Sequence, residues 1–485
     1  MISFSWPFFG DDWLTFLIFF SIVLLIIGIS ELIRNHSLLS NQHNRKLVHA
    51  VVGLLCSISP NLFHSNLQPV LLGLLFFTLN LIALKINKFK GIHSLNRISY
   101  GTLYFPISYI ILTCFFWEFS AHLTLSLILL SISDPLASLV GEIIKNPKFI
   151  YPWHDKKSIQ GSISMFLSSF IIIFILAPDI FPNNNQNIFK FSFFLASLTT
   201  LAEMISYRGS DNFSVPILSF IGIECFQTKL EIFELIMIIV IILFLIAYYF
   251  QLVDFSGFCG GCIMALIITT MGGLKYLLPL CIFFVLSSLI GRITGHKKNT
   301  QNKPPKRNLT QVIANGSVGL VICIAGYFAK DDGLLFYLFL SSVSAANSDT
   351  WATEIGKLSK IKPVSIIGFK KIESGLSGGI TSVGTFGSLL GSMTIGAVGY
   401  AFGIDIIIFW GIVLAGFAGA LIDSIVGAIF QVKYITPDGR VTERQRANSN
   451  QFSGISWIDN NLVNFFCTLS APILMYIFLL FFYKT

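Results

Sequence analysis

The chain has 485 residues, of which 54% are hydrophobic and only 12% are charged, with a formal charge of +8. Soluble domains carry about twice that charged fraction, so the composition argues against a cytosolic enzyme. It also excludes a disordered chain and a disulfide-stabilised secreted scaffold. Runs such as Trp13–Ile29 and Ile232–Phe250 approach the roughly 20 apolar residues of a membrane-crossing helix. The sequence therefore predicts a polytopic integral membrane protein.

Basic residues are concentrated in short polar stretches between the apolar runs. These stretches are 34–46, 85–97, 145–157, 206–212, 292–308, 357–371 and 433–457. The loops between them are poor in Lys and Arg, which is the positive-inside pattern with the basic loops in the cytosol. The alternation predicts about 16 transmembrane helices with both termini outside. The expected location is a bacterial inner membrane or a membrane of the thylakoid or plastid type. Because orientation explains the charge of +8, no nucleic-acid partner is expected.

One pattern occurs in each half of the chain. Asp134, Ala137 and Gly141 are repeated as Asp349, Ala352 and Gly356, in the common form D-x-x-A-[ST]-x-x-G. A lysine pair follows each motif (156–157 and 370–371), then a glycine (161 and 375), and later an Asp-Asn pair (211–212 and 459–460). The duplication predicts an all-α protein of two tandem bundles, residues 1–228 and 229–485.

The repeated residue types suit phosphoryl transfer. On a helix, Asp134, Ala137 and Gly141 share one face, and a carboxylate within a membrane helix is costly enough to suggest a function. Lysines supply charge for phosphate oxygens, and glycines before a helix let backbone N–H groups approach an anion. A divalent cation on the carboxylates and a positioned nucleophile would complete the set. The expected metal is Mg²⁺.

Each of these features also has a purely structural interpretation. A lysine pair in a cytosolic loop commonly sets orientation, and small residues at helical spacing commonly let helices pack. A single histidine near a helix end, such as His49, is commonly structural. The repeated carboxylates, Asp134 and Asp349, are the hardest to explain without a function.

The first half resembles the polyprenol kinase family, which includes dolichol and phytol kinases. The run from Asp134 to Gly161 is similar to the CTP-binding signature of that family, although Lys145 stands where a second family glycine is expected. The motifs Arg45-Lys-x-x-His49 and Glu203…Gly209-x-Asp211-Asn212 resemble the phytol kinase branch in particular. The resemblance implies CTP as the phosphoryl donor and an isoprenoid alcohol such as phytol as the acceptor.

The second half resembles a different membrane family that includes the plant phytyl-phosphate kinase. The matching residues lie in the runs 311–316, 345–356, 377–379, 384–385 and 423–424. Together the two resemblances imply a bifunctional salvage kinase, which converts the alcohol to its monophosphate and then to a diphosphate for tocopherol or quinone synthesis.

The candidate site residues follow from these patterns. Catalytic roles are predicted for Asp134, Asp211, Asp349 and Asp423, with Asp134 and Asp349 as ligands of Mg²⁺. Nucleotide binding is predicted for Ala137, Gly141, Lys156, Lys157, Ser158, Gly161, Lys370, Lys371, Gly378 and Gly379. Further polar site residues are Arg45, His49, Glu203, Asn212, Asn315, Asn347, Thr353, Glu354, Asp459 and Asn460.

Three questions stay open from the sequence: which carboxylate is the base, which prenol is bound, and which donor serves the second half. Two other functions are also possible. A CTP-dependent lipid-phosphate cytidylyltransferase would release pyrophosphate. A carrier or flippase for isoprenyl phosphates would turn over no nucleotide.

Overall fold

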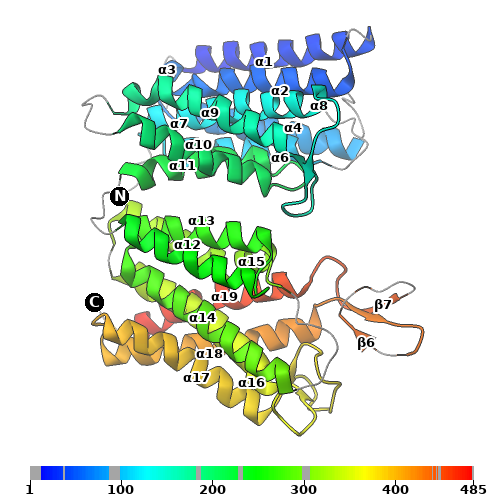
Figure 1. Cartoon of the computed structure of the whole chain (residues 1–485), viewed down its shortest axis with the longest axis vertical. Coiled ribbons are helices and arrows are strands. Elements are labelled where there is room, and N and C mark those ends of the chain that lie inside the picture. The colour runs from blue at the N-terminus through cyan, green and yellow to red at the C-terminus, as the bar shows by residue number, and fades with distance from the viewer. Residues whose placement is uncertain are drawn as a thin grey trace. The chain divides into compact units, whose positions relative to one another are not determined.

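A computed structural model describes residues 12–36, 39–86, 99–181, 187–227, 233–297, 306–331, 333–439, 441–443, 445 and 449–482. About three-quarters of these residues are in helices, and three small β-sheets lie in the connections. The chain divides into two compact units, Met1–Thr228 and Lys229–Thr485 (Figure 1). The predicted all-α class is confirmed.

Nine helices in the described part of the chain are long and apolar enough to cross a membrane. They are Asp12–Asn35, Leu67–Leu84, Ser120–Ile143, Ile159–Ile180, Phe255–Gly272, Leu274–Thr294, Leu309–Ala329, Ile406–Ile429 and Asn460–Phe482. Two shorter apolar helices are Gly101–Phe115 and Leu235–Tyr249. The figure of about 16 crossings stays a prediction, and much of the basic stretches 85–97 and 292–308 lies outside the described residues.

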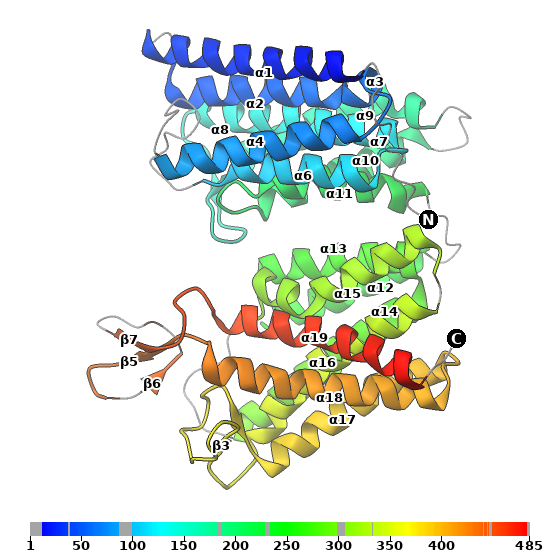
Figure 2. The same ribbon diagram turned by 180° about the vertical axis from the view of Figure 1, so that it is seen from behind.

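The first unit is a bundle whose helices lie roughly side by side (Figure 2). Its elements are α1 (Asp12–Asn35), α2 (Asn41–Ser57), α3 (Ser59–Leu62), α4 (Leu67–Ile86), α6 (Gly101–Phe115), α7 (Ser120–Ile128), η1 (Leu129–Ser133), α8 (Asp134–Ile143), β1 (Phe149–Ile150), β2 (Lys157–Ser158), α9 (Ile159–Ile180), α10 (Ile188–Met204) and α11 (Asp211–Gln227). Fully buried side chains of α7, α9 and α10, such as Leu125, Ile173 and Leu195, form one core cluster. A second buried cluster, which includes Ala137 of α8 and Met165 of α9, packs α8 against α9.

A π turn, η1, interrupts the helical run immediately before Asp134. The next residue, Pro135, has no backbone N–H, so one carbonyl in the preceding turn is left without its helical donor. Single π turns of this kind are frequent at functional sites. The local sequence therefore frees a backbone acceptor one turn from the carboxylate of Asp134.

The second unit is built around α16 (Leu334–Gly356), which packs against α14, α15, α17, α18 and α19. The remaining elements are α12 (Phe233–Tyr249), α13 (Phe255–Gly272), α14 (Leu274–Lys297), α15 (Leu309–Ala329), β3 (Val364–Ser365), β4 (Gly379–Ile380), α17 (Ser382–Ala401), α18 (Ile406–Ile429), β5 (Lys433–Ile435), β6 (Val441–Thr442), β7 (Asn450–Ser453) and α19 (Asn460–Phe482). Glycines let these helices approach closely: a Cβ on Gly391 would lie 2.9 Å from the carbonyl oxygen of Asn347.

Candidate active site

The small residues that follow Asp134 form the contact between α8 and α9. A Cβ on Gly141 would lie 2.6 Å from Ser158 Oγ, and a Cβ on Gly161 would lie 2.9 Å from the carbonyl oxygen of Ala137. Ser158 is the N-cap of α9, and its hydroxyl accepts a hydrogen bond from the N–H of Gly161 at 3.1 Å. Close packing of two helices thus explains these small residues, and it places the start of α9 beside Asp134.

The second unit contains the same contact. Thr381 is the N-cap of α17 and accepts a hydrogen bond from the N–H of Gly384 at 3.0 Å. A Cβ on Gly384 would lie 2.9 Å from the carbonyl oxygen of Ala352 and 3.4 Å from the Cα of Gly356. In both units a short antiparallel strand pair precedes the capped helix. The duplicated sequence motif therefore corresponds to a duplicated helix contact.

This correspondence corrects part of the alignment between the halves. Gly384, rather than Gly375, takes the place of Gly161, since each follows its N-cap by three residues. By the same count, Ile380 takes the place of Lys157. The pair Lys370 and Lys371 instead lies exposed in the loop between β3 and β4, where the backbone N–H of Ser365 donates to the carbonyl of Lys370. The two lysine pairs look like a repeat in the sequence. Loop residues follow no helical or strand period, however, so their order in the sequence does not show which of them occupy equivalent positions.

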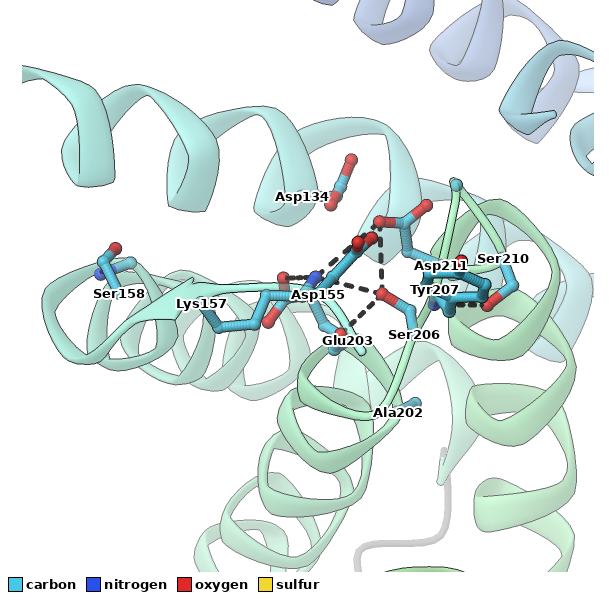
Figure 3. Close-up of polar contacts among 12 residues, drawn as sticks. Asp134, Asp155, Lys157, Ser158, Ala202, Glu203, Ser206, Tyr207, Ser210 and Asp211 are labelled. Atoms are coloured by element: carbon cyan, nitrogen blue, oxygen red, sulfur yellow. Dashed lines mark hydrogen bonds and ion pairs between the residues drawn. The ribbon is translucent and has the colours of Figure 1, made fainter. Parts of the chain in front are cut away.

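Lys157 lies at the centre of a charged cluster in the first unit (Figure 3). Its Nζ forms an ion pair and hydrogen bond with Glu203 Oε1, donates to Ser206 Oγ at 3.0 Å and lies 3.9 Å from Asp211 Oδ2. The Ser206 hydroxyl contacts Asp211 Oδ2 at 3.3 Å. The side chains of Lys157 and Glu203 are only 14% and 10% exposed. One cation is thus shared between two carboxylates in a largely dehydrated setting.

The environment of Lys157 sets its protonation. Burial by itself lowers the pKa of this ammonium group, but the carboxylates of Glu203 and Asp211 outweigh burial and raise the pKa above its usual value of 10.5. The strand carrying Lys157 is tied down nearby, because the backbone N–H of Arg208 donates to Asp155 Oδ2 at 3.0 Å. Lys157 is therefore a fixed positive charge at neutral pH.

Asp134 faces this cluster on one side and His49 on the other. His49 Nε2 lies 4.0 Å from Asp134 Oδ2 and has no hydrogen-bond partner among the described residues. The ring forms a hydrogen bond with the backbone at Leu130, inside the π turn, and packs edge-on against Phe105. With Nδ1–H donated to the carbonyl, Nε2 keeps its lone pair. The π turn thus orients a proton acceptor toward Asp134.

These groups line the polar end of a cavity of about 350 Å³. The cations and carboxylates around it are Arg45, Lys46, Lys156, Lys157, Asp134, Glu142, Glu203 and Asp211. Lys46 Nζ pairs with Glu142 Oε2 at 2.7 Å, whereas the Lys156 ammonium lies 3.4 Å from the centre of the Phe149 ring. The volume lies within the usual range for small-molecule sites.

An apolar arm extends from the polar end between four helices. Each helix contributes a line of residues at i, i+4 and i+8, which share one helix face. These lines are Phe19, Val23 and Ile27 of α1; Val48, Val52 and Cys56 of α2; Leu72, Phe76 and Asn80 of α4; and Gly101, Phe105 and Tyr109 of α6. The cavity therefore joins a charged head site to a narrow apolar compartment.

The second unit brings together a different pair of acids. The side chains of Asp349 on α16 and Asp423 on α18 are hydrogen-bonded to each other. The amide nitrogen of Asn464, in the orientation that satisfies its contacts, donates to Asp423 Oδ1 at 3.3 Å. Two carboxyl groups this close must share a proton or a cation. The structure thus places Asp423 beside Asp349, and the catalytic role of both residues stays a prediction.

Other predicted residues of the second unit lie elsewhere or have structural partners. Asn347 is fully buried, accepts from Ser287 Oγ at 3.1 Å and donates to the carbonyl of Gly391 at 2.8 Å, so it joins three helices. Asp459 accepts from the backbone N–H of Leu462 and caps α19. Glu354 accepts from Thr294 Oγ1 at 3.0 Å and from Lys357.

The remaining members of the predicted set show similar local roles. The Asn315 amide donates to the carbonyl of Gln311 at 3.0 Å, while Thr353 and Asn460 are exposed. Gly378 has a φ of +83°, and a Cβ there would lie 2.4 Å from the Cβ of Ala428 on α18. Gly378 and Gly379 shape the turn into α17. In the first unit, the Asn212 amide donates to Asp211 Oδ1 at 3.1 Å.

Three site features were not predicted from the sequence. Ser206 joins Lys157 to Asp211, and Lys46 pairs with Glu142 at the cavity edge. Ser206 lies three residues after Glu203 and five before Asp211, but a serine at a helix end is too common to be singled out. The apolar arm was also missed.

Few of the described side chains in either unit are arranged to hold a divalent cation. Within the described ranges, no group of three or more His, Cys, Asp or Glu side chains is placed to hold a metal ion. Mg²⁺ commonly enters with a nucleotide and needs only one or two carboxylates besides phosphates and water. Asp134 in the first unit and the pair of Asp349 and Asp423 in the second are carboxylates of that kind. These are the residues that would hold Mg²⁺, and binding of the ion stays a prediction.

Comparison with known proteins gives the family. Residues 238–472 match the family described as integral membrane protein DUF92. The uncharacterized membrane protein MJ0933 of Methanocaldococcus jannaschii is 36% identical over 214 residues, which are 44% of this chain and 89% of that protein. The chain belongs to the DUF92 family of integral membrane proteins. Its placement in a membrane is thereby established.

Two further relatives match parts of the chain at lower identity. Protein PGR of Arabidopsis thaliana is 27% identical over 249 residues, 45% of this chain and 86% of PGR. A protein named probable phytol kinase 2, chloroplastic, of Oryza sativa subsp. japonica is 25% identical over 219 residues, 41% of this chain and 71% of its own length. These distant similarities support a relationship with the phytol kinases. No solved structure gives a significant match.

Proposed function

We propose that this chain is a membrane kinase that phosphorylates an isoprenoid alcohol, with phytol or a similar prenol as the substrate class. The observation that carries the proposal is the cavity of the first unit, where a charged head site continues into an apolar arm. A prenol has the same division, with one hydroxyl on a hydrocarbon tail. The similarity to proteins named phytol kinase supports the assignment.

The charges of the head site suit a nucleoside triphosphate, with CTP as the expected donor. Lys157 supplies a buried positive charge for phosphate oxygens, and Lys46 and Arg45 line the same end of the cavity. Bound through Asp134, Mg²⁺ would neutralise phosphate charge as the transfer proceeds. Glu203 and Asp211 keep Lys157 protonated and in position.

The acceptor hydroxyl fits between His49 and Asp134. A hydroxyl oxygen placed there can donate its proton to His49 Nε2 while it approaches the γ-phosphorus. The new bond joins that oxygen to phosphorus, the bond to the β-phosphate oxygen breaks, and the nucleoside diphosphate leaves. His49 therefore acts as the proton acceptor in this proposal, and Asp134 would hold Mg²⁺, whose charge would offset that of the phosphates.

We extend the proposal to a second phosphorylation in the second unit, which would turn the monophosphate into the diphosphate for tocopherol or quinone synthesis. Support comes from the shared arrangement of Asp349, Gly356 and Gly384, which matches Asp134, Gly141 and Gly161. The carboxyl pair of Asp349 and Asp423 offers a cation site. We further propose that the head site of the first unit and the carboxyl pair of the second unit both face the cytosol, as the distribution of basic loops favours.

The test uses the full chain in nanodiscs with phytol, Mg²⁺ and each labelled nucleoside triphosphate in turn. Labelled phytyl monophosphate and a nucleoside diphosphate are expected, followed by phytyl diphosphate. Asp134→Asn should abolish the monophosphate but spare conversion of supplied phytyl phosphate. Asp179→Asn, an exposed carboxylate at the other end of α9, is the matched control and should behave like wild type.

The two alternatives give different products. Release of pyrophosphate with formation of a CDP-lipid would identify a cytidylyltransferase. Transbilayer movement of isoprenyl phosphates without nucleotide turnover would identify a carrier. Full monophosphate formation by Asp134→Asn would overturn the assignment of the head site.

A further inference from the structure

The apolar arm has a definite length. Each of its four lining helices contributes residues from i to i+8, a rise of about 12 Å at 1.5 Å per residue. Its far end is closed by buried side chains: Phe19, Leu72, Tyr109 and Cys56 are 3%, 1%, 2% and 7% exposed. The arm is therefore a blind compartment rather than a channel through the unit.

The closed end is braced from behind. Tyr109 Oη donates to Ser59 Oγ at 2.9 Å, and the ring of Phe19 packs on that of Phe63 with centroids 5.8 Å apart. On the neighbouring helix, a Cβ on Gly73 would lie 2.6 Å from Ile110, so α4 and α6 cannot separate without losing packing. These contacts hold the floor of the arm at a fixed depth.

An extended hydrocarbon advances about 1.25 Å per carbon, given C–C bonds of about 1.5 Å and angles near 111°. An arm of about 12 Å thus accepts about ten main-chain carbons. We propose that the arm binds only the part of an isoprenoid tail next to the hydroxyl. The longest tail that fits lies between geraniol and farnesol in length, so the dependence of affinity on tail length should break there. Longer tails continue outside the arm. The identity of the ligand rests on the proposed function.

The inference predicts how affinity depends on tail length. Each methylene group that leaves the lipid for the arm gains packing contacts with the lining side chains, so affinity at equal mole fraction in the lipid rises only while further methylene groups still enter the arm. Prenol, geraniol, farnesol and geranylgeraniol each add one isoprene unit to the one before. Affinity should rise steeply from prenol to geraniol, rise less to farnesol and change less than about threefold to geranylgeraniol.

The experiment measures binding of this alcohol series to the full chain in nanodiscs, by the shift in unfolding temperature at equal mole fraction in the lipid. Cys56→Phe should fill the floor and lower affinity for farnesol at least tenfold while prenol binding is unchanged. Leu54→Phe makes the same change two residues away, at a side chain that is 38% exposed, and should keep the wild-type profile. Leu72→Ala should instead lengthen the arm, so that affinity keeps rising to a longer tail, toward that of geranylgeraniol.

The outcomes separate this inference from the proposed function. If affinity depends on tail length as expected but no alcohol is phosphorylated, the kinase assignment is wrong and the arm remains a binding site. Phosphorylation with affinity that keeps rising through geranylgeraniol would overturn the inference and leave the kinase. Identical profiles for Cys56→Phe and Leu54→Phe would also overturn it, and Leu72→Ala decides the matter if Cys56→Phe does not fold.

Discussion

His49 Nε2 and Asp134 Oδ2 lie 4.0 Å apart across the polar end of the cavity, from helices α2 and α8. The separation is too long for a direct hydrogen bond but leaves room for an oxygen atom in contact with both. Two acceptors that face one gap are suited to a ligand that brings a proton or a cation.

Removal of the His49 acceptor should slow the chemical step. We expect His49→Gln to lower kcat by roughly 100-fold or more with little change in KM, because a positioned proton acceptor commonly contributes a factor of that size. His43→Gln, on the same helix but with a side chain that is 46% exposed, should retain full activity. Steady-state kinetics with phytol would check this, and an equal loss in both variants would exclude a specific role.

The Lys157–Glu203 pair should contribute to stability as well as activity. Lys157→Met leaves Glu203 buried without its partner, which should cost roughly 3 kcal/mol in the free energy of unfolding. The double variant Lys157→Met, Glu203→Gln removes both charges and should recover most of that stability. Activity should stay low in both variants, since the phosphate-binding charge is gone. Thermal unfolding and kinase assays on the set would separate the two effects.

The pH range of this pair follows from the raised pKa of Lys157. A lysine whose pKa is raised in the folded state contributes stability that is complete below its unfolded value of about 10.4 and is lost as pH rises through the folded value. The difference in unfolding temperature between wild type and the double variant Lys157→Met, Glu203→Gln should therefore be constant from pH 7 to about pH 10. A difference that already shrinks between pH 7 and 9 would contradict the raised pKa.

The contact between α8 and α9 should not tolerate a methyl group. Gly161→Ala places a Cβ 2.9 Å from the Ala137 carbonyl, where only backbone could move, and should cost roughly 1–3 kcal/mol. Gly28→Ala in α1 meets nothing within 4 Å and should be neutral or slightly stabilising. Unfolding temperatures of the two variants give the comparison, and an equal response would argue against the contact.

The carboxyl pair of the second unit should respond to Mg²⁺. Asp349→Asn removes one of two adjacent acids, so the variant should unfold at a higher temperature than wild type in EDTA. Wild type should gain stability from Mg²⁺, and the variant should lose that gain. Glu373→Gln, an exposed acid between β3 and β4, should respond to Mg²⁺ like wild type. A retained Mg²⁺ response in Asp349→Asn would remove the pair as a cation site.

Much of the architecture was predictable from two patterns. Long apolar runs indicate membrane helices, and small residues at helical spacing indicate close packing of two helices. The contact of Ala137 and Gly141 with the next helix follows from that spacing. The loops were predicted less well: Lys371 was paired with Lys157 by sequence order, although its loop gives no register to align.

The apolar arm could not be predicted for a different reason. Val23 lines the cavity, whereas Leu24 and Leu25 on the same helix are 43% and 63% exposed. Lipid and a hydrocarbon ligand select the same side chains, so hydropathy cannot separate the two faces. Only the arrangement of α1, α2, α4 and α6 around one space makes the distinction.

In each unit the helix that carries the aspartate, α8 or α16, packs against the first turn of the next helix, α9 or α17. This contact bears on how the two halves could diverge. The connections that precede the caps, residues 144–158 and 357–381, differ in length and in charge. The glycine contact beyond each cap is nevertheless the same. A connection fixed at both ends in this way can gain or lose residues without shifting the register of the carboxylate, so ligand preference could change there while the helices kept their packing.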